Sequence, residues 1–311
     1  MRAREQAELE YRATSISDEL RDLRTLGEVC RIERGVEFSL SLQANRARLV
    51  SDCQKTGFVP GVWRKDQLTH AFRIGSTGWI NLSSDGIRAG GKEVPWERPK
   101  VIVRMRGGQG PWRLIAAVDD HGVACYRDFC CLWPTAGWSR ECVAAVLNGP
   151  VANNHLKRQG HRADDLPEIL GTIPLPELDG RDRDPLTHCV REYLGAAGEG
   201  EGRFSPARLE QQLQRIDVIV LNGYDLPPQA ERDLLDSFAQ YQRPVPFEFT
   251  CFYEEGFRAA VPYSIYIGQA FQRSTAERIE RRMPVIADEE IHAAMQTARR
   301  LDVEGARTEH E

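Results

Sequence analysis

The sequence predicts an α+β fold, with a small, strongly bent β-sheet domain and packed helices followed by a mostly helical C-terminal region. Between about residues 35 and 135, short β-rich segments are separated by Gly, Pro and Asp. From Ser139 onward, longer runs have apolar residues at helical spacing. The chain has 311 residues, of which 41% are hydrophobic, so it can bury a sizeable core and form two units.

The first half is expected to begin with a charged helix and then change to strands. Residues 3–25 have apolar positions at helical spacing, and strand-like runs follow up to Gly35. The next strand candidates are GFVPGVW, HAFRIG, GWINLS, PKVIVRM, WRLIAAVDD and GVACYRDFCCLWP. The run RLIAAVDDHGVACY predicts a hairpin, with its turn at residues 119–122.

The second half is expected to be mainly helical. One helix begins at Ser139 and ends or breaks near Gly149, and residues 166–178 form an extended closing segment. Further helices are predicted within 179–203, after Ser205 with its following proline, after the prolines at 227–228, and beyond Ile286. The RPVPFEF run is expected to be extended. This organisation predicts an N-terminal helix (1–24), a β-rich domain (25–178) and a mostly helical region (179–311).

Composition excludes several protein classes. No run of about 18 apolar residues is present, and the N-terminus lacks the apolar core of a signal peptide, so we expect no membrane partner and a cytoplasmic location. The eight cysteines are scattered and form no CxxC pair, which favours reduced, mostly buried thiols over disulfides or zinc. We therefore predict no metal site and no cofactor.

Charge is unevenly distributed along the chain. The net charge is -5, but residues 31–162 hold 20 Lys and Arg against 11 Asp and Glu. The remainder holds 21 against 35. A basic block inside an acidic chain is expected when one domain contacts a polyanion and another does not. A solvated basic face without a partner is the alternative.

The run RMRGGQGPWR, residues 104–113, concentrates arginine, glycine and tryptophan after a strand-like segment. It lacks the glycine spacing of a P-loop or a dinucleotide fold, and no helix clearly begins after it, so nucleotide cradling is disfavoured. No serine nucleophile elbow or HExxH pair is present, and His121 and its aspartate neighbours are better explained as turn residues. Because arginine binds phosphate and guanine bidentately, the run is interpreted as a DNA-contacting loop, with a wide hairpin turn as the alternative.

The candidate DNA contacts come from three parts of the sequence. The loop and the strand before it supply five of them, a neighbouring loop supplies two, and a helix C-terminus supplies two weaker ones that could simply complement the helix dipole. In order, they are Lys100, Arg104, Arg106, Trp112, Arg113; Arg64, Lys65; Lys157 and Arg158. Trp112 either packs on a sugar or base or anchors the loop inward. The sequence does not distinguish base contacts from phosphate contacts.

The order of four segments resembles a known family. They are TLGEVCRIERGVEF, VPWERPKVIVRMRG, ECVAAVLNGPVANNHLKRQ and GTIPLPEL. Together they resemble target-recognition domains of bacterial restriction-modification systems, namely type I specificity subunits and the TaqI-like C-terminal specificity domain of adenine-specific DNA methyltransferases. The resemblance covers about residues 25–178, and LNGP replaces the commoner LNS. Residues 216–238 and the RPVPFEF run resemble the segment that follows this domain in large adenine-methyltransferase-like proteins.

The resemblance implies sequence-specific recognition of double-stranded DNA for a restriction-modification or phage-defence adenine methyltransferase. The family's catalytic domain lies upstream of such a region and is expected to be absent here, so the partner is a separate adenine-methyltransferase or restriction subunit. The chain is accordingly predicted not to be an enzyme. Two alternatives stay open: a non-autonomous part of a methyltransferase or nuclease, and a protein-interaction module without DNA binding.

Overall fold

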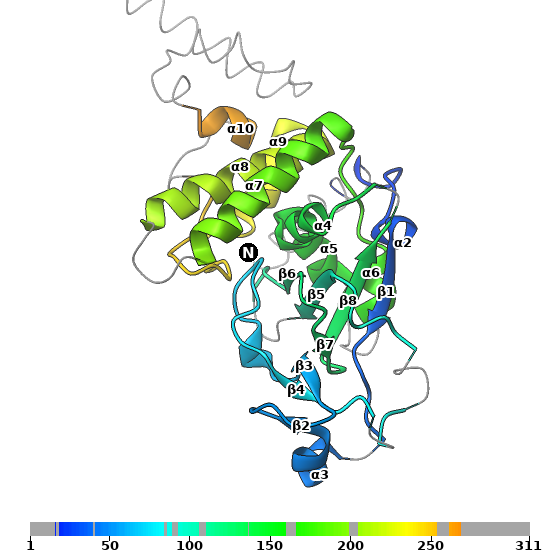
Figure 1. The fold of residues 1–311 in the computed structure, drawn as a ribbon. Coiled ribbons are helices and arrows are strands. Elements are labelled where there is room, and N and C mark those ends of the chain that lie inside the picture. Colours follow the sequence, from blue (N-terminus) through cyan, green and yellow to red (C-terminus); the bar gives the residue numbers. More distant parts are fainter. Residues whose placement is uncertain are drawn as a thin grey trace, which may run out of the picture. The chain divides into compact units, whose positions relative to one another are not determined.

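A computed structural model describes residues 16, 19–39, 41–83, 86–88, 93–105, 110–135, 137–159, 166–198, 205–253 and 261–268. The fold is α+β, with two small four-stranded sheets and surrounding helices (Figure 1). The chain divides into two compact units. The first comprises residues 20–224 and 240–250, and the second comprises 225–239 with the parts of the chain before 20 and after 250.

The first sheet is entirely antiparallel and has the strand order β1-β8-β5-β6. Its strands are β1 (Cys30–Arg34), β5 (Lys100–Met105), β6 (Leu114–Asp119) and β8 (Phe129–Pro134). Strands β5 and β6 pair over their full lengths, from Lys100 opposite Asp119 to Met105 opposite Leu114. The arginine- and glycine-rich run therefore connects two paired strands, in agreement with the wide-hairpin alternative.

The second sheet has the order β2-β4-β3-β7. Its strands are β2 (Val50–Ser51), β3 (Val59–Val62), β4 (Gly78–Ile80) and β7 (Ala124–Cys125). The predicted hairpin at residues 119–122 is wrong, because β7 does not pair with β6 but runs parallel to β3. Gly122 has a φ of +71°, and a Cβ there would lie 2.4 Å from the Glu97 carbonyl oxygen, so a glycine is required where the chain turns toward the second sheet.

The main apolar core lies between the two sheets. Ile102, Ile115 and Cys131 project from the first sheet into a buried cluster that also contains Val62 and Ile80 of the second sheet. Alternate residues of β5, β6 and β8 point to the other face, where helix α4 (Arg140–Asn148) packs on β6. Both faces of the first sheet are covered, which explains its nearly continuous apolar strands.

Helix boundaries after Ser139 follow local signals. The Ser139 hydroxyl accepts a hydrogen bond from the Cys142 amide (3.1 Å), and Gly149 separates α4 from α5 (Pro150–Gln159), as predicted. The extended segment expected from residue 166 is wrong in its first part, which forms α6 (Leu166–Gly171). Leu166, Ile169 and Leu170 are buried at helical spacing, and a proline in the first turn does not disturb a helix.

The long helices α7 (Gly180–Gly198) and α8 (Pro206–Tyr224) pack on each other and belong to the first unit. This unit therefore extends beyond the boundary at 178/179 that we predicted. Arg243, in the segment 240–250, donates to both carboxylate oxygens of Asp217 on α8 (2.5 and 2.8 Å) and to the Asn148 carbonyl oxygen (3.1 Å). This buried pair holds the segment against α4 and α8.

The remaining elements are short. They are α2 (Leu26–Val29), α3 (Leu42–Leu49) and a 3-10 turn, η1 (Lys65–Gln67), in the first unit, and α9 (Pro228–Asp236) and α10 (Tyr263–Tyr266) in the second. Most of the predicted helix 1–24 and the tail helix after Ile286 lie outside the described residues. Within the described part of the chain, no helix is both long and apolar enough to cross a bilayer.

Candidate nucleic-acid interface

The connection between β5 and β6 turns its tryptophan inward. Trp112 is 5% exposed, its indole nitrogen donates to the Tyr241 carbonyl oxygen (3.2 Å), and the Arg243 guanidinium lies 4.9 Å from its ring centroid. Trp112 therefore anchors the loop and is not available to stack on a base. Arg106 and residues 107–109 lie outside the described residues, so the contact predicted for Arg106 is not described.

Lys100, expected to contact DNA, is a core residue. Its side chain is fully buried, pairs with the equally buried Asp119 carboxylate and donates to the Trp96 carbonyl oxygen (2.9 Å). The prediction for Lys100 is corrected, because the neighbouring strand places a carboxylate directly opposite it. Asp119 also accepts hydrogen bonds from the His121 and Val123 amides, so one buried ion pair organises the turn after β6.

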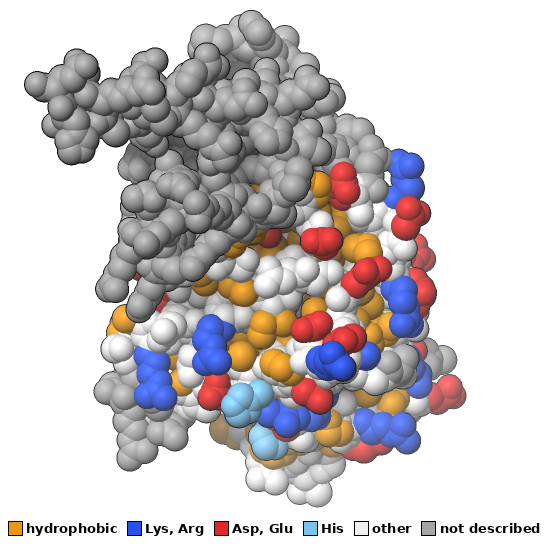
Figure 2. All heavy atoms as spheres, turned by 90° about the horizontal axis from the view of Figure 1, so that it is seen from above, with side chains coloured by type: hydrophobic (Ala, Val, Ile, Leu, Met, Phe, Trp, Pro, Cys, Tyr) orange, Lys and Arg blue, Asp and Glu red, His pale blue; other side chains and the backbone are white. Residues whose placement is uncertain are grey.

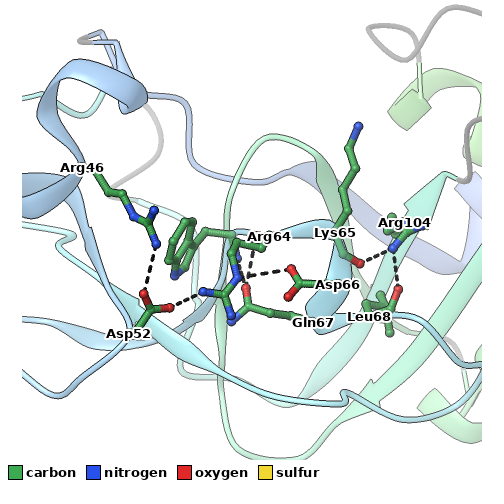
Figure 3. A network of polar contacts seen from close by, with 9 residues as sticks. Arg46, Asp52, Arg64, Lys65, Asp66, Gln67, Leu68 and Arg104 are labelled. Atoms are coloured by element: carbon green, nitrogen blue, oxygen red, sulfur yellow. Dashed lines mark hydrogen bonds and ion pairs between the residues drawn. The ribbon is translucent and has the colours of Figure 1, made fainter.

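Arg104 connects the two sheets. Its guanidinium donates to the carbonyl oxygens of Lys65 and Leu68 (2.9 Å for Leu68), residues of the turn that follows β3 (Figure 3). Arg104 therefore positions this turn, whereas we expected it to contact DNA directly. The turn comprises residues 63–68 and is called the Trp63 turn below.

Gln67 gives the Trp63 turn its shape. Its buried side-chain oxygen accepts from the amides of Trp63 and Arg64, both at 2.8 Å. A side chain that accepts two amides of its own turn holds the backbone in one conformation. No sequence signal marks Gln67, because its role depends on this local fold.

Cationic side chains gather on the Trp63 turn and the adjoining helix α3. The guanidinium carbons of Arg46 and Arg64 each lie 4.9 Å from the Trp63 ring centroid, and both guanidinium groups pair with Asp52. Asp66 pairs with Arg64 as well (3.2 Å). Figure 3 shows the Lys65 side chain pointing away from this network. Two of the predicted residues therefore lie side by side on the Trp63 turn, Lys65 exposed and Arg64 partly exposed.

This set of cations extends along the second sheet and is called the second-sheet cluster. It consists of the cations of residues 41–68, which are Arg46, Arg48, Lys55, Arg64 and Lys65, and this stretch holds only two carboxylates, Asp52 and Asp66. Arg46 and Arg48 lie in the last turn of α3. The sequence signal for Arg46 and Arg48 was the basic composition of residues 31–162.

The remaining predicted contacts lie elsewhere. Lys157 and Arg158 are exposed in the last turn of α5, and Arg113 is partly buried just before β6. The Arg113 amide donates to the Asn153 side chain (2.7 Å). The structure therefore does not bring these three residues together with Arg64 and Lys65 through any contact that it describes.

Two asparagines from the LNGP and VANNH runs have structural roles at the edge of β6 that is not paired with β5. The Asn148 amide group accepts from the Ala116 nitrogen and donates to the Ala116 oxygen, both at 2.9 Å. Asn153 accepts from the amides of Arg113 and Leu114. Together with the backbone of Phe72, which donates to the Ala116 oxygen (2.7 Å) and accepts from the Val118 amide (3.1 Å), these side chains satisfy the edge.

A separate, concave site carries no signal in the sequence. A cleft of about 630 Å³ is lined by four arginines and two tryptophans, together with Glu141 and several prolines. The arginines and tryptophans are Arg31, Arg98, Arg140, Arg191, Trp133 and Trp138. We call it the arginine cleft. No sequence signal marks it, because its residues come from β1, the loop before β5, β8, α4 and α7.

Three of the cleft's arginines are held by carboxylates. Arg31 pairs with Glu33 (3.0 Å), Arg140 with Asp120 (2.9 Å), and Arg191 with the buried Glu141 (2.6 Å). The hydrogen bond and charge of Glu141 raise the pKa of the Arg191 guanidinium. These pairs fix the directions of the guanidinium groups around the cleft.

The face drawn in Figure 2 does not carry a patch of one sign among its described residues. There, Lys and Arg side chains alternate with Asp and Glu side chains. Part of the basic excess of residues 31–162 lies instead in the second-sheet cluster and the arginine cleft. Within the described ranges, no group of three His, Cys, Asp or Glu side chains is arranged to hold a metal ion.

Comparison with known proteins does not assign the chain to a family. No protein-family model matches the sequence, and no curated protein matches it significantly.

Proposed function

We propose that this chain recognises double-stranded DNA and serves a separate adenine-methyltransferase or restriction subunit. The observation that supports DNA contact is the second-sheet cluster, in which Arg46 and Arg64 are held on Trp63 and joined by Asp52. The resemblance of residues 25–178 to target-recognition domains supports the choice of DNA and of the partner class.

The cluster is suited to phosphate for a physical reason. Guanidinium groups held against an aromatic ring are ordered before binding, so less side-chain entropy is lost when a phosphate arrives. Asp52 and Asp66 are exposed, so phosphate oxygens can exchange with their carboxylates at little cost. Lys65 adds a cation directed toward solvent.

Salt-dependent DNA binding by the whole chain tests the proposal. We expect fluorescence anisotropy with labelled duplex DNA to show binding that weakens linearly with the logarithm of salt concentration. Lys65→Ala removes an exposed cation that makes no ion pair within the described part of the chain, so the fold should be unaffected. If Lys65 contacts a phosphate, this variant lowers the salt slope by about one unit on every sequence.

The matched control is Arg88→Ala. Arg88 is exposed and pairs with Glu37 (3.0 Å), and it lies outside both the second-sheet cluster and the arginine cleft. The control should bind duplex DNA with the wild-type slope. Two results would reject the second-sheet cluster as a phosphate-binding surface. One is an affinity that does not change with salt concentration, and the other is the same salt slope for the wild type, Lys65→Ala and Arg46→Ala/Arg64→Ala.

A further inference from the structure

The arginine cleft is built differently from the second-sheet cluster. It is concave, its volume of about 630 Å³ falls in the range of small-molecule sites, and it combines flat apolar walls with guanidinium groups. Pro95, Pro99 and Pro134 line it beside Trp133 and Trp138. Such walls favour a planar ring over an extended, flexible chain.

The cleft's charge corresponds to about one phosphate group. Arg31, Arg140 and Arg191 are each paired with a carboxylate. Arg98 lines the same cleft and is exposed, and its side chain makes no ion pair within the described part of the chain. One uncompensated guanidinium, with three more close by, is suited to a single anionic group.

Helix α4 adds to the positive potential. Ser139 and the first two residues of α4 line the cleft, so the amino end of a nine-residue helix opens onto it. The partial positive charge of a helix N-terminus attracts anions, and here it reinforces the guanidinium groups. The buried Glu141 carboxylate is neutralised by Arg191, so it does not cancel this potential.

Trp138 is the partly exposed ring of the cleft, and Trp133 forms its buried wall. Trp133 is 8% exposed, and its buried indole nitrogen has no hydrogen-bond partner among the described residues. Arg31 lies 6.0 Å from the Trp133 ring centroid and stands opposite it in the β1–β8 register. Trp138 is held by Arg183, whose guanidinium lies 5.7 Å from its ring centroid.

We propose that the arginine cleft binds a nucleotide unit, that is, one phosphate with its attached base. Arg98 contacts the phosphate, with Arg31 and Arg140 beside it, and the base packs against Trp138 and the neighbouring prolines. The same chemistry is offered by a free mononucleotide and by the end of a single strand. This site is separate from the second-sheet cluster and does not depend on its role in duplex binding.

Calorimetric titration of the whole chain with dAMP, deoxyadenosine and inorganic phosphate tests both halves of the site. We expect dAMP to bind more tightly than either fragment. Arg98→Ala should weaken dAMP binding at least about tenfold, since a charged hydrogen bond is worth roughly 1.5–3 kcal/mol. Trp138→Ala should bring the affinity for dAMP close to that for phosphate, and Arg88→Ala should change neither.

A short 5′-phosphorylated oligodeoxyadenylate identifies the source of the nucleotide. Equal affinities for it and dAMP indicate a free nucleotide, and tighter binding of the oligonucleotide, still sensitive to Arg98→Ala, indicates a strand end. The proposal is overturned if dAMP fails to bind, if phosphate binds as tightly as dAMP, or if Arg98→Ala binds like the wild type. Duplex binding by these variants is measured separately, so the absence of dAMP binding would not count against the second-sheet cluster as a DNA contact.

Discussion

Lys100 shows how one residue can fit a functional pattern and still be structural. It belongs to a basic stretch and precedes the arginine-rich run, yet its ammonium group is buried against Asp119 and the Trp96 carbonyl oxygen. Burial of an ion pair is tolerated because each charge is compensated and further hydrogen bonds satisfy the remaining atoms.

Lys100→Ala should therefore reduce stability and not merely DNA affinity. It leaves the buried Asp119 carboxylate without its counter-charge, and we expect the free energy of unfolding to fall by about 3–5 kcal/mol. Urea denaturation followed by circular dichroism measures this change. Lys65→Ala, the exposed counterpart, should unfold like the wild type. Equal stability of the two variants would mean that the Lys100–Asp119 pair does not hold the turn after β6.

At the scale of elements, residues close together in the sequence predicted where helices begin and end, but they did not predict which strands pair. The start of α4 follows from Ser139, and its separation from α5 follows from Gly149 and Pro150, all of which act within one or two helical turns. The pairing of β7 with β3 could not be predicted in this way, because the two strands are far apart in the sequence. Short strands carry too little pattern to specify a distant partner.

Helix α9 contains a buried carboxyl group that makes the stability of the fold depend on pH. The Glu231 carboxylate accepts from the Tyr263 amide at the start of α10 (2.6 Å), and burial raises the pKa of Glu231 to about 7 although this hydrogen bond lowers it in part. In the unfolded chain the pKa of a glutamate is near 4.5. The folded state therefore binds more protons between these values, and its stability falls as the pH rises from about 4.5 to about 7.

Glu231→Gln should remove this dependence. The glutamine oxygen still accepts from the Tyr263 amide but cannot ionise, so the variant should gain stability over the wild type across this pH range. The gain is expected to be on the order of 3 kcal/mol above pH 7, from the difference between the two pKa values. Denaturation curves at pH 5 and pH 8 measure it, and parallel pH profiles for the two proteins would contradict a raised pKa.

At the scale of the whole chain, the reactivity of the cysteines reports which parts are inaccessible to solvent. All eight have free thiols; six are buried, whereas Cys53 and Cys251 are exposed. This agrees with the prediction that most are buried without disulfides. Desolvation raises the pKa of both Cys30 and Cys130 to about 12, so these thiols are poor nucleophiles as well as inaccessible.

Thiol labelling with a chromogenic disulfide should therefore be biphasic. Two thiols should react rapidly in the native protein, and the other six only after unfolding, because they must first reach solvent. Cys53→Ser and Cys251→Ser should each remove one fast equivalent. Any fast-reacting thiol in the Cys53→Ser/Cys251→Ser double variant would show that one of the buried sites opens in solution.

The sequence by itself determined the α+β class, the two strands that flank the arginine- and glycine-rich run, and the helices that follow Ser139 and Ser205. These features follow from alternation, helical spacing and capping residues, which act between neighbours along the chain. It also placed Arg64 and Lys65 on a loop beside a strand, and the structure has both in the turn that follows β3.

Only the tertiary structure decided which charges face solvent and which are compensated. Lys100 is neutralised by a residue on the next strand, Arg104 is used to connect the sheets, and Trp112 turns inward. The arginine cleft joins residues from four separate stretches between 31 and 191. A charge is stabilised by whatever lies within a few ångströms of it in space, and that neighbourhood is set by the folding of distant segments and not by the order of residues.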